Sequence, residues 1–176
     1  MFSGSRIRSP APAIVAILVI ALMLLLRQRV TPTDQEPSVG SRVSARIVQV
    51  IDGDTVELQD GTRLRLLGID APELARDDTE AEGGAEEAKQ WLHEQIRGAT
   101  VELRYGPERQ DRYGRTLAWV YLDDGTLLNE TLLQEGHARL VTSFGLPLDL
   151  SDRLHMAAAQ ARVQSRGIWS GAGVPR

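Results

Sequence analysis

The feature that most constrains the fold is a run of three short strand patterns joined by two tight-turn signals. In each stretch, apolar residues alternate with polar ones; the stretches are 43–51, 55–58 and 62–67. Asp52-Gly53 and Asp60-Gly61 separate them, and Asp-Gly pairs are typical of hairpin turns. The alternation slips by one residue near Ile47-Val48, which indicates a β-bulge. The pattern predicts an antiparallel meander of three strands, with Leu64 and Leu66 facing inward.

Strand and helix patterns alternate in the rest of the domain. Two further strands are predicted at 100–104 and 116–122. Apolar residues at helical spacing predict three helices, at 86–97, 127–135 and 151–165. Ser151 is the predicted N-terminal cap of the last helix. The order indicates an α+β, mainly β domain, built as a five-stranded Greek-key barrel of the oligonucleotide-binding (OB) type with three helices.

The N-terminus has a different character from this domain. Ala13 to Leu26 is an unbroken apolar run flanked by arginines. As a helix it would reach roughly 21 Å, against ~30 Å for a bilayer core. We interpret 1–29 as a hydrophobic helix that acts as an uncleaved signal-anchor, with residues 13–26 in the membrane and the domain exported. A cleaved secretion signal and a buried soluble helix are the alternatives. Residues 30–40 have the composition of a linker, followed by a domain at 41–170 and a tail at 171–176.

Composition excludes several classes of protein. The 176-residue chain has no cysteine, which excludes disulfides and thiolate metal sites. Its net charge is -4, and acidic residues outnumber basic ones beyond residue 39. A protein that coats nucleic acid is usually basic, so this balance argues against that class. It does not exclude an enzyme with a locally basic site.

Charged residues gather in three short motifs, each beside an apolar run. The motifs are Asp52-Gly53-Asp54-Thr55, Arg65-Leu66-Leu67-Gly68-Ile69-Asp70-Ala71-Pro72-Glu73 and Asp111-Arg112-Tyr113-Gly114-Arg115. Taken singly, each is also explained by a turn, a strand end or a solvated side chain. If they converge, their acids can hold a hard divalent cation and their arginines can bind a phosphate. Together they predict metal-assisted cleavage of a phosphodiester.

The order and spacing of these motifs resemble the staphylococcal nuclease (thermonuclease) family. The resemblance covers roughly residues 44–169 and includes Asn129-Glu130 and Ile168-Trp169-Ser170. It implies a five-stranded barrel with three helices, and a Ca²⁺-dependent nuclease that leaves 3′-phosphate and 5′-hydroxyl ends. The implied substrates are DNA and RNA, preferably single-stranded or flexible, and the implied domain is monomeric.

The resemblance also implies a role for each matched residue. The implied Ca²⁺ ligands are the carboxylates of Asp54 and Asp70 and the backbone carbonyl of Ala71, with Asp52 as an outer acid. Glu73 matches a general base or water-orienting group. Arg65 and Arg115 match the two arginines that contact the scissile phosphate. Arg112 and Tyr113 match residues near the terminal phosphate.

Some features depart from the family pattern. Residues 75–87 carry six acids and one arginine, where the best-known member of the family is rich in lysine. We expect this acidic loop to weaken general affinity for a polyanion. Thr142 and Phe144 stand where that member has tyrosines. The alternative functions are a non-catalytic OB-type oligonucleotide-binding module and an envelope interaction module that uses the acidic loop. A silent module is expected to lose the matched acids or arginines, and this chain keeps them.

Overall fold

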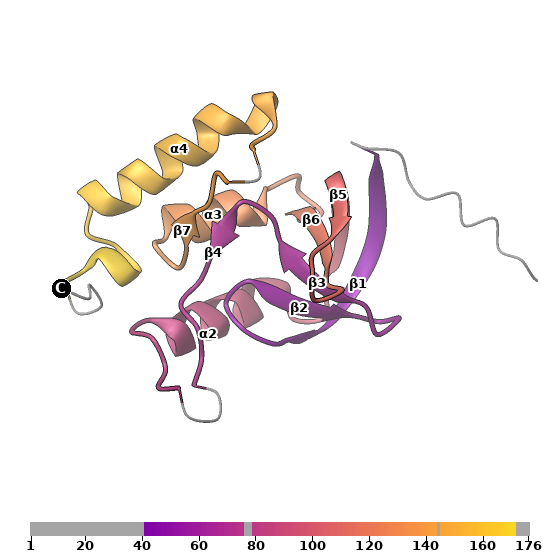
Figure 1. Ribbon diagram of the computed structural model, residues 1–176, viewed down its shortest axis with the longest axis horizontal. Helices are drawn as coiled ribbons and strands as arrows, with labels where there is room; N and C mark the ends of the chain where they lie inside the picture. Colours follow the sequence, from indigo (N-terminus) through magenta and orange to yellow (C-terminus); the bar gives the residue numbers. More distant parts are fainter. Residues whose placement is uncertain (1–40, 76–78, 144, 172–176) are drawn as a thin grey trace, which may run out of the picture. The chain divides into compact units, whose positions relative to one another are not determined.

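Five strands close into a barrel in the computed structural model, which describes residues 41–75, 79–143 and 145–171 (Figure 1). Their spatial order is β1-β2-β3-β6-β5. The strands are β1 (Arg42–Val50), β2 (Thr55–Leu58), β3 (Arg63–Leu66), β5 (Thr100–Gln110) and β6 (Thr116–Tyr121). The predicted mainly β, five-stranded barrel is confirmed. The predicted N-terminal helix, the linker and Phe144 lie outside the described residues.

The first three strands form the predicted meander. Leu64 and Leu66 are buried, while Arg63 and Arg65 lie on the opposite face of β3. The pairing of β1 with β2 shifts between Ile47 and Gln49, which confirms the predicted bulge. The parallel pairing of β3 with β6 closes the barrel and brings the second and third motifs side by side.

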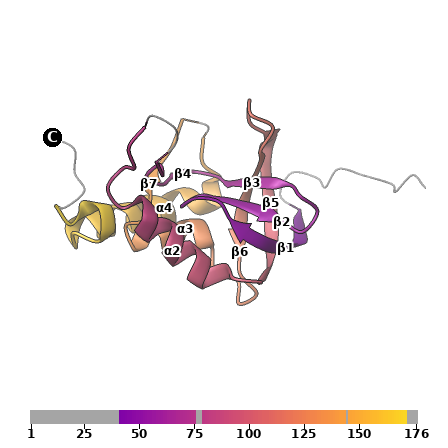
Figure 2. The ribbon, with the colours of Figure 1, turned by 90° about the horizontal axis from the view of Figure 1, so that it is seen from below.

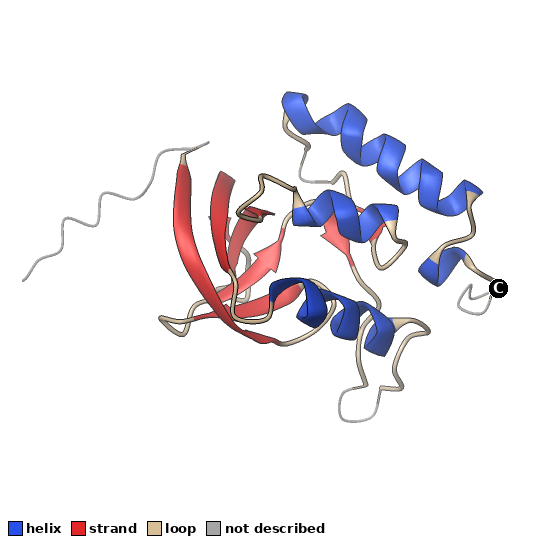
Figure 3. Ribbon diagram, turned by 180° about the vertical axis from the view of Figure 1, so that it is seen from behind, coloured by secondary structure: helices blue, strands red, loops and turns tan. Residues whose placement is uncertain are grey.

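Three α-helices of the described residues lie together on one side of the barrel (Figures 1 and 3). They are α2 (Ala85–Ile96), α3 (Leu128–Gln134) and α4 (Leu148–Val163), followed by a short 3₁₀ helix at Gly167–Trp169. Each buries an apolar stripe, as the helical spacing predicted. In the described part of the chain, no helix is long and apolar enough to span a membrane.

The start of α4 corrects one prediction. The helix begins at Leu148 and its N-cap position is Pro147, so the prediction of Ser151 as the cap was wrong. Leu150 is buried and anchors the first turn, whereas Leu148 is 97% exposed. An exposed leucine breaks the apolar period, which is why the sequence pattern missed that turn.

Two further strands were not predicted. β4 (Ile69–Asp70) pairs antiparallel with β7 (Arg139–Leu140), so that Asp70 lies opposite Arg139. Figure 2 shows this pair beside the helices, away from the barrel strands. A two-residue strand is too short to carry a detectable alternation. β5 also extends to Gln110 rather than ending at Arg104, which brings its end to the third motif.

Candidate active site

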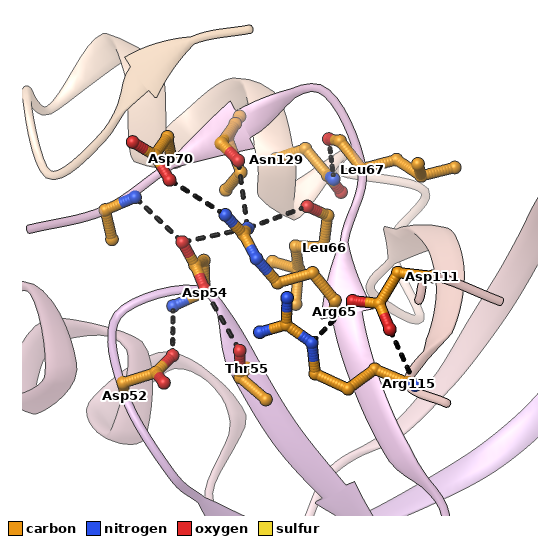
Figure 4. Close-up of polar contacts among 12 residues, drawn as sticks. Asp52, Asp54, Thr55, Arg65, Leu66, Leu67, Asp70, Asp111, Arg115 and Asn129 are labelled. Carbon is orange, nitrogen blue, oxygen red and sulfur yellow. Dashed lines mark hydrogen bonds and ion pairs between the residues drawn. The ribbon is translucent and has the colours of Figure 1, made fainter. Parts of the chain in front are cut away.

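Asp54 lies at the centre of the first motif and is 4% exposed. Its carboxylate accepts hydrogen bonds from the Ala71 backbone N–H at 2.8 Å and from the Thr55 hydroxyl at 3.0 Å (Figure 4). Its own N–H donates to Asp52 Oδ1 at 3.2 Å. Gly53 makes the close approach possible, because a Cβ there would lie 2.6 Å from that of Ala71. The turn after β1 is thereby held against the chain that follows β4.

Arg65 joins this turn to β4. Its Nη1 lies 2.8 Å from Asp54 Oδ2 and its Nη2 lies 3.0 Å from Asp70 Oδ1. Nη1 also donates to the carbonyl oxygens of Leu66 and Ile69, at 3.2 and 2.9 Å. The Arg65 side chain is 14% exposed, against 50% for that of Asp70. One guanidinium therefore bridges the two carboxylates that the family resemblance assigns to one cation (Figure 4).

The electrostatic environment of Asp54 is unusual for an aspartate. Burial raises its pKa to about 7. The Arg65 guanidinium and the Ala71 N–H act in the opposite direction, whereas the neighbouring Asp52 raises the pKa further. The ionised form of Asp54 is therefore incompletely compensated by the protein, and additional positive charge would stabilise it.

Arg115 is held by an acid of its own motif. Its Nε lies 2.7 Å from Asp111 Oδ2, and the backbone N–H groups of Tyr113 and Arg115 each donate to Asp111 Oδ1 at 2.9 Å. Burial alone would raise the pKa of Asp111, but the hydrogen bonds from Arg115 and Tyr113 outweigh it and lower that pKa. This positioning role of Asp111 was not predicted. An aspartate that opens a turn four residues before an arginine was the available signal.

Asn129, on α3, is fully buried next to the chain that carries Arg65. Its side-chain amide donates to the carbonyl oxygen of Leu67 at 2.8 Å and accepts from the Val120 N–H at 2.9 Å. It thus joins α3 to β6 and to the chain just after Arg65. The family resemblance included Asn129 but predicted no role for it. The available sequence signal for a buried structural role was a single amide side chain at the start of an apolar helix.

Two adjoining hollows are lined by six of the predicted site residues. The first, of about 560 Å³ and mainly apolar, is lined by a set that includes Arg65, Asp70, Arg112, Tyr113 and Arg115. The second, of about 810 Å³ and mainly polar, is lined by Glu73 among others and shares Tyr113 and Arg115 with the first. Asp52, Asp54 and Ala71 are buried and line neither hollow. Arg115 therefore lies where the two hollows meet.

Tyr113 lies at this border and is 68% exposed. The guanidinium carbons of Arg112 and Arg115 lie 4.7 and 5.5 Å from the centre of its ring. Cation–π contacts of this kind hold the ring beside both arginines. The ring face and the two cations can together receive a sugar and a phosphate.

The donor set suits a hard cation. The carboxylates of Asp54 and Asp70 approach the same guanidinium, and both offer oxygen atoms only. Within 41–75, 79–143 and 145–171, no three His, Asp or Glu side chains are gathered closely enough to hold a metal ion by themselves. A cation at Asp54 and Asp70 would therefore need backbone carbonyls and water as further ligands, and Ca²⁺ accepts both.

Comparisons with known proteins show which family the sequence matches. The family model described as "Staphylococcal nuclease homologue" matches residues 63–171. A thermonuclease of Staphylococcus hyicus is 33% identical over 162 residues, which cover 88% of this chain and 94% of that protein. An uncharacterized endonuclease of Escherichia coli O157:H7 is 32% identical over 139 residues, 77% of this chain and 83% of that protein. Endonuclease YncB of Bacillus subtilis is 30% identical over 135 residues, 74% and 64% respectively. The chain belongs to the staphylococcal nuclease family and is a hydrolase of the nuclease type.

Proposed function

We propose that the chain is a Ca²⁺-dependent nuclease that hydrolyses phosphodiester bonds of DNA and RNA and leaves 3′-phosphate and 5′-hydroxyl ends. The observation that carries the proposal is the pair of anchored arginines. Arg65 and Arg115 line one hollow, and each is held by a carboxylate within 3.0 Å. Two fixed guanidinium groups on one surface match the charge and shape of a phosphate.

The arginines act where negative charge develops. As a water oxygen attacks phosphorus, charge grows on the non-bridging oxygens, and donors that are already oriented stabilise it without reorganisation. Arg65 is oriented by Asp54 and Asp70, and Arg115 by Asp111. Neither guanidinium therefore needs to be ordered during the reaction.

Glu73 is the proposed acceptor of the water proton. It lines the polar hollow together with Arg115, which is one of the two arginines proposed to bind the scissile phosphate. The water oxygen forms a new bond to phosphorus, and its proton passes to the carboxylate. The bond between phosphorus and the 5′ oxygen breaks, and that oxygen takes a proton from solvent. The phosphate stays on the 3′ oxygen of the other product.

Asp54, Asp70 and the carbonyl of Ala71 are the proposed Ca²⁺ ligands, with Asp52 outside them. The raised pKa of the buried Asp54 supports this assignment, because a cation would stabilise its ionised form. When bound, the ion supplies Lewis-acid stabilisation of the phosphate charge. Arg112 and Tyr113 are proposed to contact a neighbouring phosphate or sugar from the same hollow.

The proposal extends to location and assembly. Residues 13–26 anchor the chain in a membrane and the monomeric nuclease domain is exported; secretion after cleavage of the signal is the alternative. The support for a membrane segment is the unbroken apolar run at residues 13–26 near the N-terminus. The substrate is preferably single-stranded or flexible nucleic acid.

Cleavage assays on the full-length chain test the proposed reaction. Labelled DNA and RNA oligonucleotides, single- and double-stranded, are incubated with Ca²⁺ or with a chelator, and phosphatase treatment identifies the product ends. We expect Ca²⁺-dependent cleavage of both nucleic acids, with phosphatase-sensitive 3′ ends. Tight binding without cleavage would favour the non-catalytic module. Cleavage that resists the chelator would remove Ca²⁺ from the mechanism.

A single conservative substitution tests the role of Glu73. Glu73→Gln nearly keeps the side-chain volume but removes the charge that accepts the proton. We expect turnover to fall by roughly 10²–10⁴-fold, the range for general-base groups. Calorimetric Ca²⁺ affinity should stay close to that of the parent, since Glu73 is not a proposed ligand. A parallel loss of Ca²⁺ affinity would assign Glu73 to the cation instead.

A further inference from the structure

The polar hollow contains an arginine to which the proposed reaction gives no task. Arg63 lines this hollow together with Glu73 and Arg115. Its side chain is exposed. In the part of the chain that the structure describes, the Arg63 side chain makes no hydrogen bond or ion pair, although Glu57 lies opposite it in the strand register. Its guanidinium is therefore available to a ligand.

Arg63 and Arg65 lie on the same face of β3, with the buried Leu64 between them on the other face. Alternate residues of a strand are ~6.7 Å apart. This is close to the separation of successive phosphates along a single nucleic-acid strand. A strand whose scissile phosphate contacts Arg65 can therefore present its next phosphate to Arg63.

The barrel pairing places Arg63 next to Arg115 as well. β3 and β6 run parallel with Leu64 opposite Thr116, so the residues that precede these two are neighbours across the strands. Both arginines line the polar hollow. Arg115 also lines the apolar hollow, whereas Arg63 does not. The polar hollow thus continues the substrate path beyond the site of cleavage.

An exposed arginine is most often only solvated. Arg63 differs from the exposed Arg46 on β1, which lines neither hollow. The mainly polar lining of its hollow also suits a backbone phosphate better than a base.

Building on the proposed nuclease function, we propose that Arg63 binds the phosphate adjacent to the scissile one, in the polar hollow, so that the substrate strand spans the site and is cut internally. This subsite recognises charge on the backbone and carries no base specificity. Its contribution is to binding, because Arg63 does not contact the phosphate at which charge develops.

Short substrates with a single cleavable bond test this subsite. A trinucleotide keeps one phosphodiester, and its neighbouring linkage is made uncleavable in two forms. One form is a charged phosphonate, in which CH₂ replaces the 5′ bridging oxygen; the other is a neutral methylphosphonate. Both are prepared with the altered linkage on the 5′ or the 3′ side of the phosphodiester. The full-length parent chain is compared with Arg63→Gln and with Arg46→Gln as the matched control.

The parent should bind the charged form about three- to tenfold more tightly, seen as a lower KM, on one side only. Arg63→Gln should raise KM for that charged form by the same factor and remove the difference between the two forms. Its kcat should stay within about twofold. The slope of log affinity against log salt should fall by about 0.7, as expected for the loss of one phosphate contact on a single strand. Arg46→Gln should match the parent.

The proposal is overturned if Arg63→Gln keeps the preference for the charged linkage that the parent shows, or if the parent shows no preference on either side. A failure of the nuclease function gives a different result, since the parent then cleaves none of the trinucleotides. In that event, fluorescence anisotropy with the same trinucleotides and Ca²⁺ decides whether Arg63 binds the neighbouring phosphate. Loss of the charge preference in Arg63→Gln would support the subsite on a non-catalytic surface, and its retention would refute it.

Discussion

Arg65 forms ion pairs with both carboxylates that we assign to Ca²⁺, whereas Arg115 forms an ion pair with Asp111. We predict that Arg65→Ala and Arg115→Ala each lower kcat by roughly 10²–10³, as for the loss of an oxyanion donor. Only Arg65→Ala should raise Ca²⁺ affinity in the absence of substrate, because it removes a competing positive charge. Calorimetric titration and steady-state kinetics measure the two effects, with Arg46→Ala as the control. Equal changes in Ca²⁺ affinity for both variants would contradict the ligand assignment.

Burial of Asp54 predicts an uncommon pH dependence of stability. The pKa of Asp54 is about 7 in the folded state, against 3.8 for an unperturbed aspartate. Between pH 3.8 and pH 7 the folded protein therefore keeps a proton that the unfolded chain releases. Without Ca²⁺, its contribution to stability therefore falls as pH rises from about 4 to about 7. Asp54→Asn should be more stable than the parent by roughly 1–4 kcal/mol at pH 8 and nearly equal at pH 4. Urea unfolding at both values measures the difference. An advantage at pH 8 no larger than at pH 4 would refute the assigned pKa.

At the scale of elements, the Asn129 side-chain amide on α3 is hydrogen-bonded to two segments, the chain after β3 at Leu67 and β6 at Val120. Asn129→Ala would leave the Leu67 carbonyl and the Val120 N–H buried without their partner. We predict a loss of roughly 2–4 kcal/mol in the free energy of unfolding, together with a lower kcat. Gln134→Ala on the same helix is the control and should cost far less. A loss confined to the unfolding free energy, with unchanged kcat, would make Asn129 a purely structural residue.

Elements with a long, clear period were predictable from the sequence, and the contacts between elements were not. The alternation in β3 predicted which face carries Arg63 and Arg65, and the slip at Ile47-Val48 predicted the bulge. β4 and β7 have only two residues each and carry no such pattern. The ion pairs of Arg65 with Asp54 and Asp70 depend on how the meander and β4 meet in space. Sequence spacing can identify such groups as candidates for one site, but only the packing of the elements determines which of them are in contact.

At the scale of the whole molecule, activity and location are predicted to reside in different parts of the chain. A fragment that begins at Ser41 should be soluble and as active on short oligonucleotides as the full chain, because every proposed site residue lies beyond it. The full chain should fractionate with membranes and resist extraction by salt, which does not release a hydrophobic anchor. Cell fractionation and immunoblotting test both statements. A free protein shortened near residues 27–40 would replace the anchor with a cleaved signal.

The short pairing of β4 with β7 bears on when the protein becomes active during its synthesis. Every residue with a proposed chemical role lies between Asp52 and Arg115, yet the strand that carries Asp70 is paired only once Arg139 and Leu140 exist. A ribosome that has made the first 135 residues has therefore supplied all the acids and arginines without the partner of β4. The growing chain therefore acquires its proposed reactive groups before the strand pairing that places Asp70.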